Sequence, residues 1–122
     1  MAYTLEFEKL IEYDAGEPGI SLSIELRLGN DSTKFEAKID TGSSFCVFER
    51  KYGEALGLEI ESGLRNRVGT ATGSFWAFGH QVMLVIESYE FDAMVYFAED
   101  EFFNRNVLGR RGAIENLRIG II

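Results

Sequence analysis

The chain has 122 residues, of which 46% are hydrophobic and 26% are charged, and its formal net charge is −8. This length and composition predict a single folded domain over residues 1–122 that buries a real core. Phosphate groups are bound mainly by clustered lysine and arginine, so the negative charge argues against nucleic acid and anionic membranes as partners.

Cysteine and histidine are too scarce for most cofactor chemistry. Cys46 and His80 are each the single residue of their type, which allows no internal disulfide and gives no zinc spacing. We therefore expect no metal and no cofactor, and we expect Cys46, within an apolar run, to be a small buried side chain. No secretory leader or membrane-spanning run is recognisable, which favours a cytoplasmic protein.

Most of the chain has the pattern of β-strands. Ile20–Leu28 alternates apolar and polar side chains, as a strand with one buried face does, and the glycine-containing turn 29–32 follows it. The predicted strands, in chain order, are Leu5–Tyr13, Ile20–Leu28, Thr33–Ile39, Arg67–Thr72, Ser74–Phe78, Gln81–Ile86 and Glu90–Phe97. Helices are predicted only over Phe48–Leu56 and Arg110–Leu117, so the fold class is all-β and barrel-like with one or two short helices.

The sequence Asp40-Thr41-Gly42 lies between a predicted strand and the apolar run 45–48, and it occurs once. Asp, Gly and Ser are also ordinary turn residues, so a loop without chemistry is the simpler interpretation of this motif alone. A weak internal repeat adds to the pattern, because residues 35–40 resemble residues 91–96.

Taken together, five segments in this order resemble the retropepsin-like (retroviral-type) aspartic proteases, in their cellular or bacterial single-domain form. They are the strand Phe35–Ile39 leading into the Asp40 motif, the apolar run 45–48, the Leu56-Gly57-Leu58 segment, the hairpin over 68–76, and Val107-Leu108-Gly109-Arg110. The resemblance implies a closed barrel-like subunit with a flap hairpin, active as a homodimer. Each subunit would supply one aspartate, and the pair would share a proton and activate water to hydrolyse peptide bonds.

The resemblance also implies roles for individual residues. The catalytic loop would be Asp40, Thr41 and Gly42. The peptide or protein substrate would be bound by Ser43, by the hairpin tip Thr70, Ala71, Thr72 and Gly73, and by Val107. The dimer interface would include Thr41, Arg110, Ile119, Ile121 and Ile122.

Two features depart from this family. Viral members pair the arginine after the conserved glycine with an aspartate at the position of Ser44, so that ion pair cannot form here. The strand expected at residues 118–122 is also short for one that interleaves with a partner's termini. A non-catalytic binding or dimerisation module with the same fold therefore stays open, as does an unrelated β-barrel that binds a small ligand with Asp40 in a turn.

Overall fold

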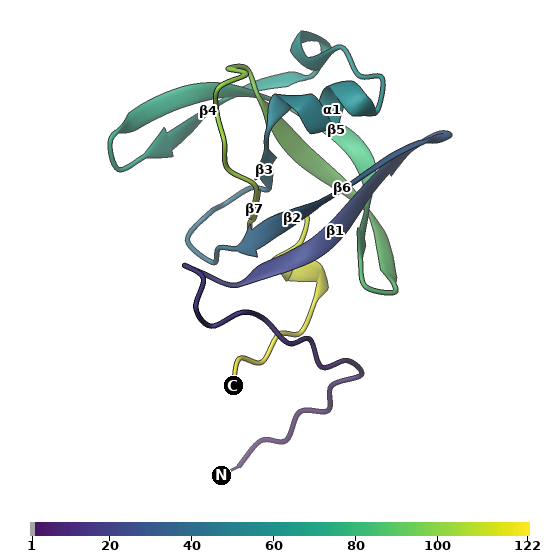
Figure 1. Cartoon of the computed structure of the whole chain (residues 1–122), viewed down its shortest axis with the longest axis vertical. Helices are drawn as coiled ribbons and strands as arrows, with labels where there is room; N and C mark the ends of the chain where they lie inside the picture. Colours follow the sequence, from purple (N-terminus) through teal and green to yellow (C-terminus); the bar gives the residue numbers. More distant parts are fainter. Residues whose placement is uncertain (1) are drawn as a thin grey trace.

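The computed structural model describes residues 2–122, and its strands form a single sheet (Figure 1). The strands are β1 (Ser21–Leu28), β2 (Asp31–Ile39), β3 (Val47–Phe48), β4 (Leu64–Thr70), β5 (Gly73–Ile86), β6 (Tyr89–Ala98) and β7 (Val107–Leu108). The helical elements are α1 (Arg50–Ala55) and the 3-10 turns η1 (Ile60–Ser62) and η2 (Ile114–Asn116).

The sheet is nearly closed on itself. Its seven strands run in the order β1-β2-β7-β3-β6-β5-β4, and an additional β1–β5 pairing joins the two sides. Apolar side chains at alternate positions of the strands fill the interior of the ring. Ile24 and Leu26 of β1 point inward beside Phe35 and Ala37 of β2. The predicted all-β, barrel-like fold class with little helix is confirmed.

Strands from the first and second halves of the chain alternate at the centre of the sheet, in the order β2-β7-β3-β6. β2 pairs in parallel with β7, and β3 pairs in parallel with β6, while Val47 of β3 and Val107 of β7 join the two pairs antiparallel. The repeated segments 35–40 and 91–96 lie largely in β2 and β6, so they take corresponding places in these halves. This arrangement brings the end of β2, and with it Asp40, to the junction between the halves.

The β4–β5 hairpin projects from the ring, because among the described strands β4 pairs with β5 alone (Figure 1). The prediction of two separate strands, Ser74–Phe78 and Gln81–Ile86, is wrong, since β5 is continuous over 14 residues. Gly79 does not mark a turn. A Cβ there would lie 2.9 Å from both Met94 and Tyr96, so the glycine serves close packing against β6.

The helices are shorter than predicted. α1 begins at Arg50 rather than Phe48, because Val47 and Phe48 are used as strand β3. The predicted helix Arg110–Leu117 is wrong: only the turn Ile114–Asn116 forms there. Gly112 has a φ of +94°, which a right-handed helix does not allow, and it interrupts the segment.

Both terminal segments lie outside the ring, on the same side of the molecule (Figure 1). Leu5–Tyr13 was predicted as a strand and is not one, and residues 118–122 also form none. An isolated strand has no neighbour to accept and donate its backbone hydrogen bonds, so alternation alone does not create one. No helix among residues 2–122 is long and apolar enough to cross a membrane.

Candidate active site

The Asp40 loop is anchored where the two halves meet. The Asp40 amide donates to the Leu108 carbonyl at 3.0 Å, and the Lys38 amide donates to the Asn106 carbonyl at 2.9 Å. On the other side of the loop, the amides of Arg110 and Arg111 donate to the Ser43 and Ser44 carbonyls, both at 2.9 Å. The loop is thus hydrogen-bonded on both flanks to β7 and to the residues on either side of β7.

Within the loop, the Asp40 side chain shapes its own turn. The Gly42 amide donates to Asp40 Oδ1 at 2.9 Å, and the Ser43 amide donates to the Asp40 carbonyl at 3.1 Å. Asp40, Thr41 and Gly42 are all exposed in the single chain. The carboxylate is therefore oriented by a backbone donor and is open to a molecule that approaches the loop from outside.

Arg110 braces this loop, and no carboxylate among residues 2–122 lies within 4.0 Å of its guanidinium. Its guanidinium donates to the Thr41 carbonyl and to Ser44 Oγ, each at 3.1 Å. Ser44, where the expected ion pair cannot form, thus accepts a hydrogen bond from Arg110 through its hydroxyl. The contact joins both ends of the loop to the segment that follows β7.

Next to the loop lies a second apolar cluster, distinct from the core of the ring. Val47, Ala77 and Tyr96 are buried in it. Partly buried side chains from the loop, the β4–β5 hairpin, β6, the segment before β7 and β7 itself pack on them, namely Phe45, Val68, Phe75, Met94, Phe103 and Val107. Val107, predicted to line a substrate pocket, thus shares a cluster with the stem of the hairpin.

The remaining predicted substrate residues lie apart from this cluster. Thr70, Ala71, Thr72 and Gly73 form the exposed tip of the β4–β5 hairpin, where Thr70 Oγ1 donates to the Gly73 carbonyl at 3.0 Å. Ser43 is half-buried, and its hydroxyl donates to the Phe45 carbonyl at 2.7 Å. That hydroxyl is engaged within the loop in the single chain.

The predicted dimer residues at the C-terminal end are exposed. Ile119 and Ile121 expose 40% and 64% of their surface, and Ile122 is fully exposed. Phe7 of the N-terminal segment lies against this end, since a Cβ on Gly120 would be 2.8 Å from Phe7 Cζ. The two terminal segments therefore touch, and both present apolar side chains outward.

Two residues that support the site were not predicted. Asn106 clamps the start of α1, because its side chain accepts from the Glu49 amide at 2.9 Å and donates to the Glu49 carboxylate at 2.7 Å. Gly109 lies so close to the Phe45 backbone that no side chain fits. The sequence marks Gly109 only through its place in the Leu-Gly-Arg segment, and nothing marks Asn106.

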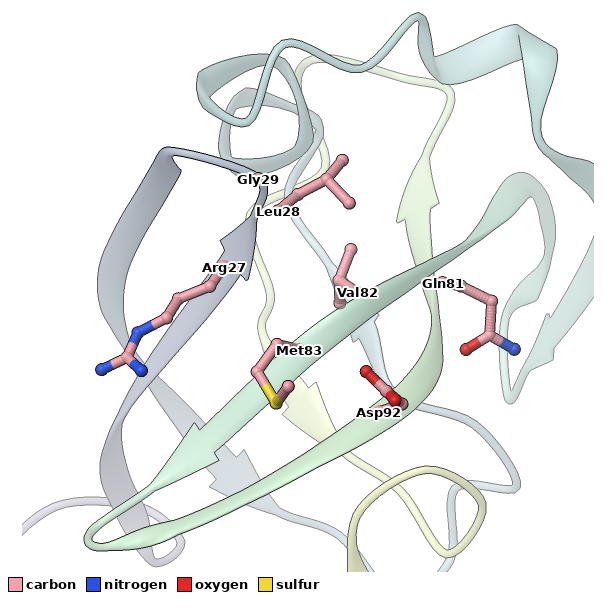
Figure 2. A pocket seen from close by; sticks show the side chains of 7 residues that line it. All are labelled: Arg27, Leu28, Gly29, Gln81, Val82, Met83 and Asp92. Carbon is pink, nitrogen blue, oxygen red and sulfur yellow. The ribbon is translucent and has the colours of Figure 1, made fainter.

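Two surface cavities lie on the β5–β6 pair. One, of about 460 Å³, is lined by Arg27, Met83 and Asp92 among others and contains no predicted site residue (Figure 2). The other, of about 440 Å³, adjoins the Asp40 loop through Phe45 and Arg111. Among residues 2–122, no group of three or more His, Cys, Asp or Glu side chains is placed to hold a metal ion.

Comparison with solved structures identifies the fold. The chain is similar to the EIAV protease in its complex with the inhibitor HBY-793, with a TM-score of 0.62 and 16% sequence identity. The match covers 82% of this chain and 88% of that chain. No protein-family model matches the sequence, and no curated protein does. At this identity the likeness establishes a retropepsin-like fold.

Proposed function

We propose that this chain is one subunit of a homodimeric aspartic endopeptidase. The observation that carries the proposal is the exposed Asp40, held by Gly42 in a loop at the junction of two chain halves, in a fold similar to that of a retroviral protease. The chain contains one Asp-Thr-Gly. Two carboxylates are needed to bind one water and exchange its protons, so a second copy must supply the other.

The reaction would follow from the pair of Asp40 side chains. In the dimer, the two Asp40 carboxyl groups would lie near enough to bind the same water. Two carboxyl groups in one such site cannot both ionise, so they would share one proton. The ionised Asp40 takes a proton from the bound water while the water oxygen attacks the peptide carbonyl carbon. The protonated Asp40 donates its proton to the carbonyl oxygen. Breakdown of this tetrahedral species transfers a proton to the amide nitrogen, breaks the C–N bond and releases an acid and an amine.

The other predicted residues would hold the substrate. The β4–β5 hairpin would act as a flap, with Thr70 to Gly73 reaching over an extended peptide and excluding water. The second apolar cluster, with Val107, would form the wall for apolar substrate side chains. Thr41 and Arg110 would lie near the subunit boundary, and Ile119, Ile121 and Ile122 would pack against the partner.

A peptide-library cleavage assay, analysed by mass spectrometry from pH 4 to 7.5, tests the proposal. Wild type and Asp40→Asn are compared at high and low protein concentration. We expect cleavage by wild type alone, with activity per subunit falling on dilution. Full activity in Asp40→Asn would contradict the mechanism, and activity independent of concentration down to nanomolar levels would contradict a weak obligate dimer.

A non-catalytic binding or dimerisation module is the second candidate. Ser44 favours it, because the Arg110 brace is an exposed hydrogen bond to a hydroxyl rather than an ion pair. The same assay separates the two functions. Dimerisation of both wild type and Asp40→Asn without cleavage of any library peptide would support the module.

A further inference from the structure

The charges of this acidic chain are divided between two regions. Residues 37–48, 62–86 and 102–114 (the site segments) include the predicted site residues up to Arg110, and each range is bounded on both sides by a glutamate. They contain six basic residues and one acidic residue, Asp40, and so carry a formal charge of +5. The rest of the chain has six basic and nineteen acidic residues, a formal charge of −13. The β4–β5 hairpin has no carboxylate of its own.

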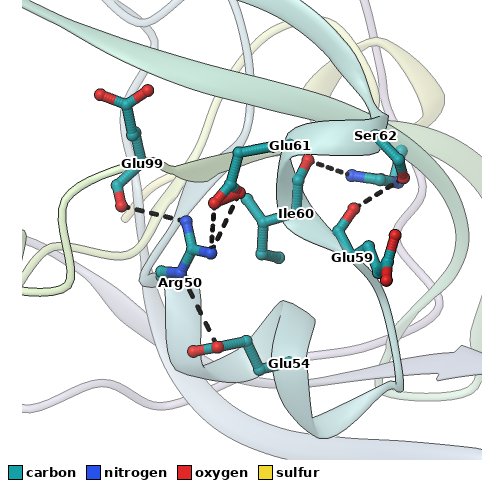
Figure 3. Close-up of polar contacts among 8 residues, drawn as sticks. Arg50, Glu54, Glu59, Ile60, Glu61, Ser62 and Glu99 are labelled. Atoms are coloured by element: carbon teal, nitrogen blue, oxygen red, sulfur yellow. Dashed lines mark hydrogen bonds and ion pairs between the residues drawn. The ribbon is translucent and has the colours of Figure 1, made fainter.

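Outside the site segments, most of the basic side chains are neutralised by ion pairs. Arg50 illustrates this, with its guanidinium between Glu54 and Glu61 and donating also to the Glu99 carbonyl (Figure 3). Arg27 pairs with Glu25 and Glu90 in the same way. Lys34 and Lys51 make longer pairs, at 4.0 and 3.8 Å.

The six basic residues of the site segments are different. They are Lys38, Arg65, Arg67, Arg105, Arg110 and Arg111, and none has a carboxylate within 4.0 Å in the described chain. Arg65 and Arg67 lie over the Trp76 ring, with 3.6 and 5.0 Å to its centroid. Arg111 lies 5.7 Å from the Phe45 ring centroid. These ring contacts supply no full negative charge, and Arg111 shares the lining of the second cavity with Asp92 and Glu115.

Three of these residues, Lys38, Arg110 and Arg111, flank the Asp40 loop. Lys38 comes two residues before Asp40, Arg110 donates to the Thr41 carbonyl, and the Arg111 amide donates to the Ser44 carbonyl. Arg105 precedes Asn106, whose carbonyl accepts from the Lys38 amide. A carboxylate on a bound peptide within about 8 Å of such groups is attracted with little screening at physiological ionic strength.

We propose that the substrates of this site are acidic polypeptides, with Asp or Glu flanking the residues at the scissile bond. The inference rests on the proposed function and specifies its substrate class. Arg105 and Arg111 would be the specificity-determining residues, because they are exposed and do not brace the loop through their side chains. Unpaired positive charge around a cleft raises the local concentration of an acidic substrate and its association rate.

The test uses three quenched peptides with one shared apolar core, taken from the library assay, flanked on both sides by Glu, Gln or Lys. We expect kcat/KM to be at least about tenfold higher for the Glu peptide than for the Lys peptide at 50 mM NaCl, a ratio that collapses at 500 mM. Arg105→Gln/Arg111→Gln should remove most of this preference. The control variant Lys34→Gln/Lys51→Gln removes the same number of charges at positions away from the site. It should keep the preference for the Glu peptide.

Each outcome bears on a different claim. If no peptide is cleaved, the proposed function fails. If all three are cleaved at equal rates at low salt, the function stands and the acidic substrate class is wrong. If both double variants keep the preference equally, Arg105 and Arg111 are not the specificity-determining residues. A labelled single-stranded oligonucleotide that binds more tightly than the Glu peptide would overturn the proposal and assign the positive charge to nucleic acid.

Discussion

Arg110 is the side chain on which the geometry of the Asp40 loop depends most directly. Its two donors reach the Thr41 carbonyl and Ser44 Oγ, and the flat guanidinium satisfies both acceptors at once. We expect Arg110→Ala to lower kcat/KM by tenfold or more, because the loop would lose its fixed orientation. Arg110→Lys should restore little of the lost kcat/KM, since an ammonium group cannot donate to both acceptors with the geometry of a planar guanidinium. Steady-state kinetics beside Lys34→Ala, an exposed control, measures the effect, and equal losses in both variants would contradict it.

Cys46 makes a pH-dependent contribution to stability. Burial raises the pKa of its thiol to about 11, above the ordinary value of 9.0. The folded state therefore keeps the thiol protonated where the unfolded chain ionises, so stability is unaffected below about pH 9 and falls as the pH rises toward 11. We expect urea midpoints to fall more steeply between pH 8.5 and 10.5 in wild type than in Cys46→Ala. The native thiol should also resist aromatic disulfide reagents at pH 8 and react once unfolded.

At the scale of elements, α1 is held close to the sheet by a glycine. A Cβ on Gly53 would lie 2.6 Å from Ile60 Cδ1 and 2.8 Å from Phe97 Cγ, both in the core. Gly53→Ala should therefore destabilise the protein by about 1–3 kcal/mol, despite the better helix propensity of alanine. Gly69→Ala is the matched control, since no atom of residues 2–122 outside its immediate chain neighbours lies within 4 Å of its added Cβ. Chemical denaturation compares the two, and a Gly53→Ala protein as stable as the control would show that α1 can shift.

The elements also show where sequence reasoning works. Strands β1 and β2 were predicted nearly to the residue, because alternation and the turn at Gly29 are local properties of the chain. The prediction of Leu5–Tyr13 failed. Its alternation breaks at Glu8-Lys9 and Leu10-Ile11, and a strand also needs a neighbouring strand that the pattern does not name. Gly79 and Gly112 were misjudged for a related reason. Gly79 serves packing against Tyr96, which is distant in sequence, and Gly112 has a φ of +94° that prevents the predicted helix.

The site was predicted in the same uneven way. The Asp40 motif was recognisable from contiguous residues, and its place at the end of a strand follows from the pattern before it. The second apolar cluster draws residues from the loop, the hairpin and the segment before β7, so only the fold could assemble it. Asn106 belongs to the same class, because its partner Glu49 lies 57 positions away.

For the whole molecule, the terminal segments are the surface that the single chain leaves unfinished. Tyr3, Leu5, Phe7 and Leu10 expose half or more of their surface, and Ile119 to Ile122 lie beside them without a strand. Apolar side chains grouped in this way favour association. These segments lie outside the closed ring, so their loss should not unfold it.

Deletion of residues 118–122 tests whether this surface joins two copies. We expect the truncated protein to retain its far-ultraviolet circular dichroism and melting temperature at low concentration, because the ring loses no strand. Its sedimentation should shift toward the monomer at concentrations where the full chain is dimeric, and peptide cleavage should fall in parallel, since one chain carries one Asp40. The substitution Leu64→Ser removes an apolar side chain that is 61% exposed on the hairpin and serves as the control. A truncated protein that is still dimeric and active would place the subunit contact at the Asp40 loop itself, and the double variant Thr41→Ala/Arg110→Ala would then be the one that dissociates.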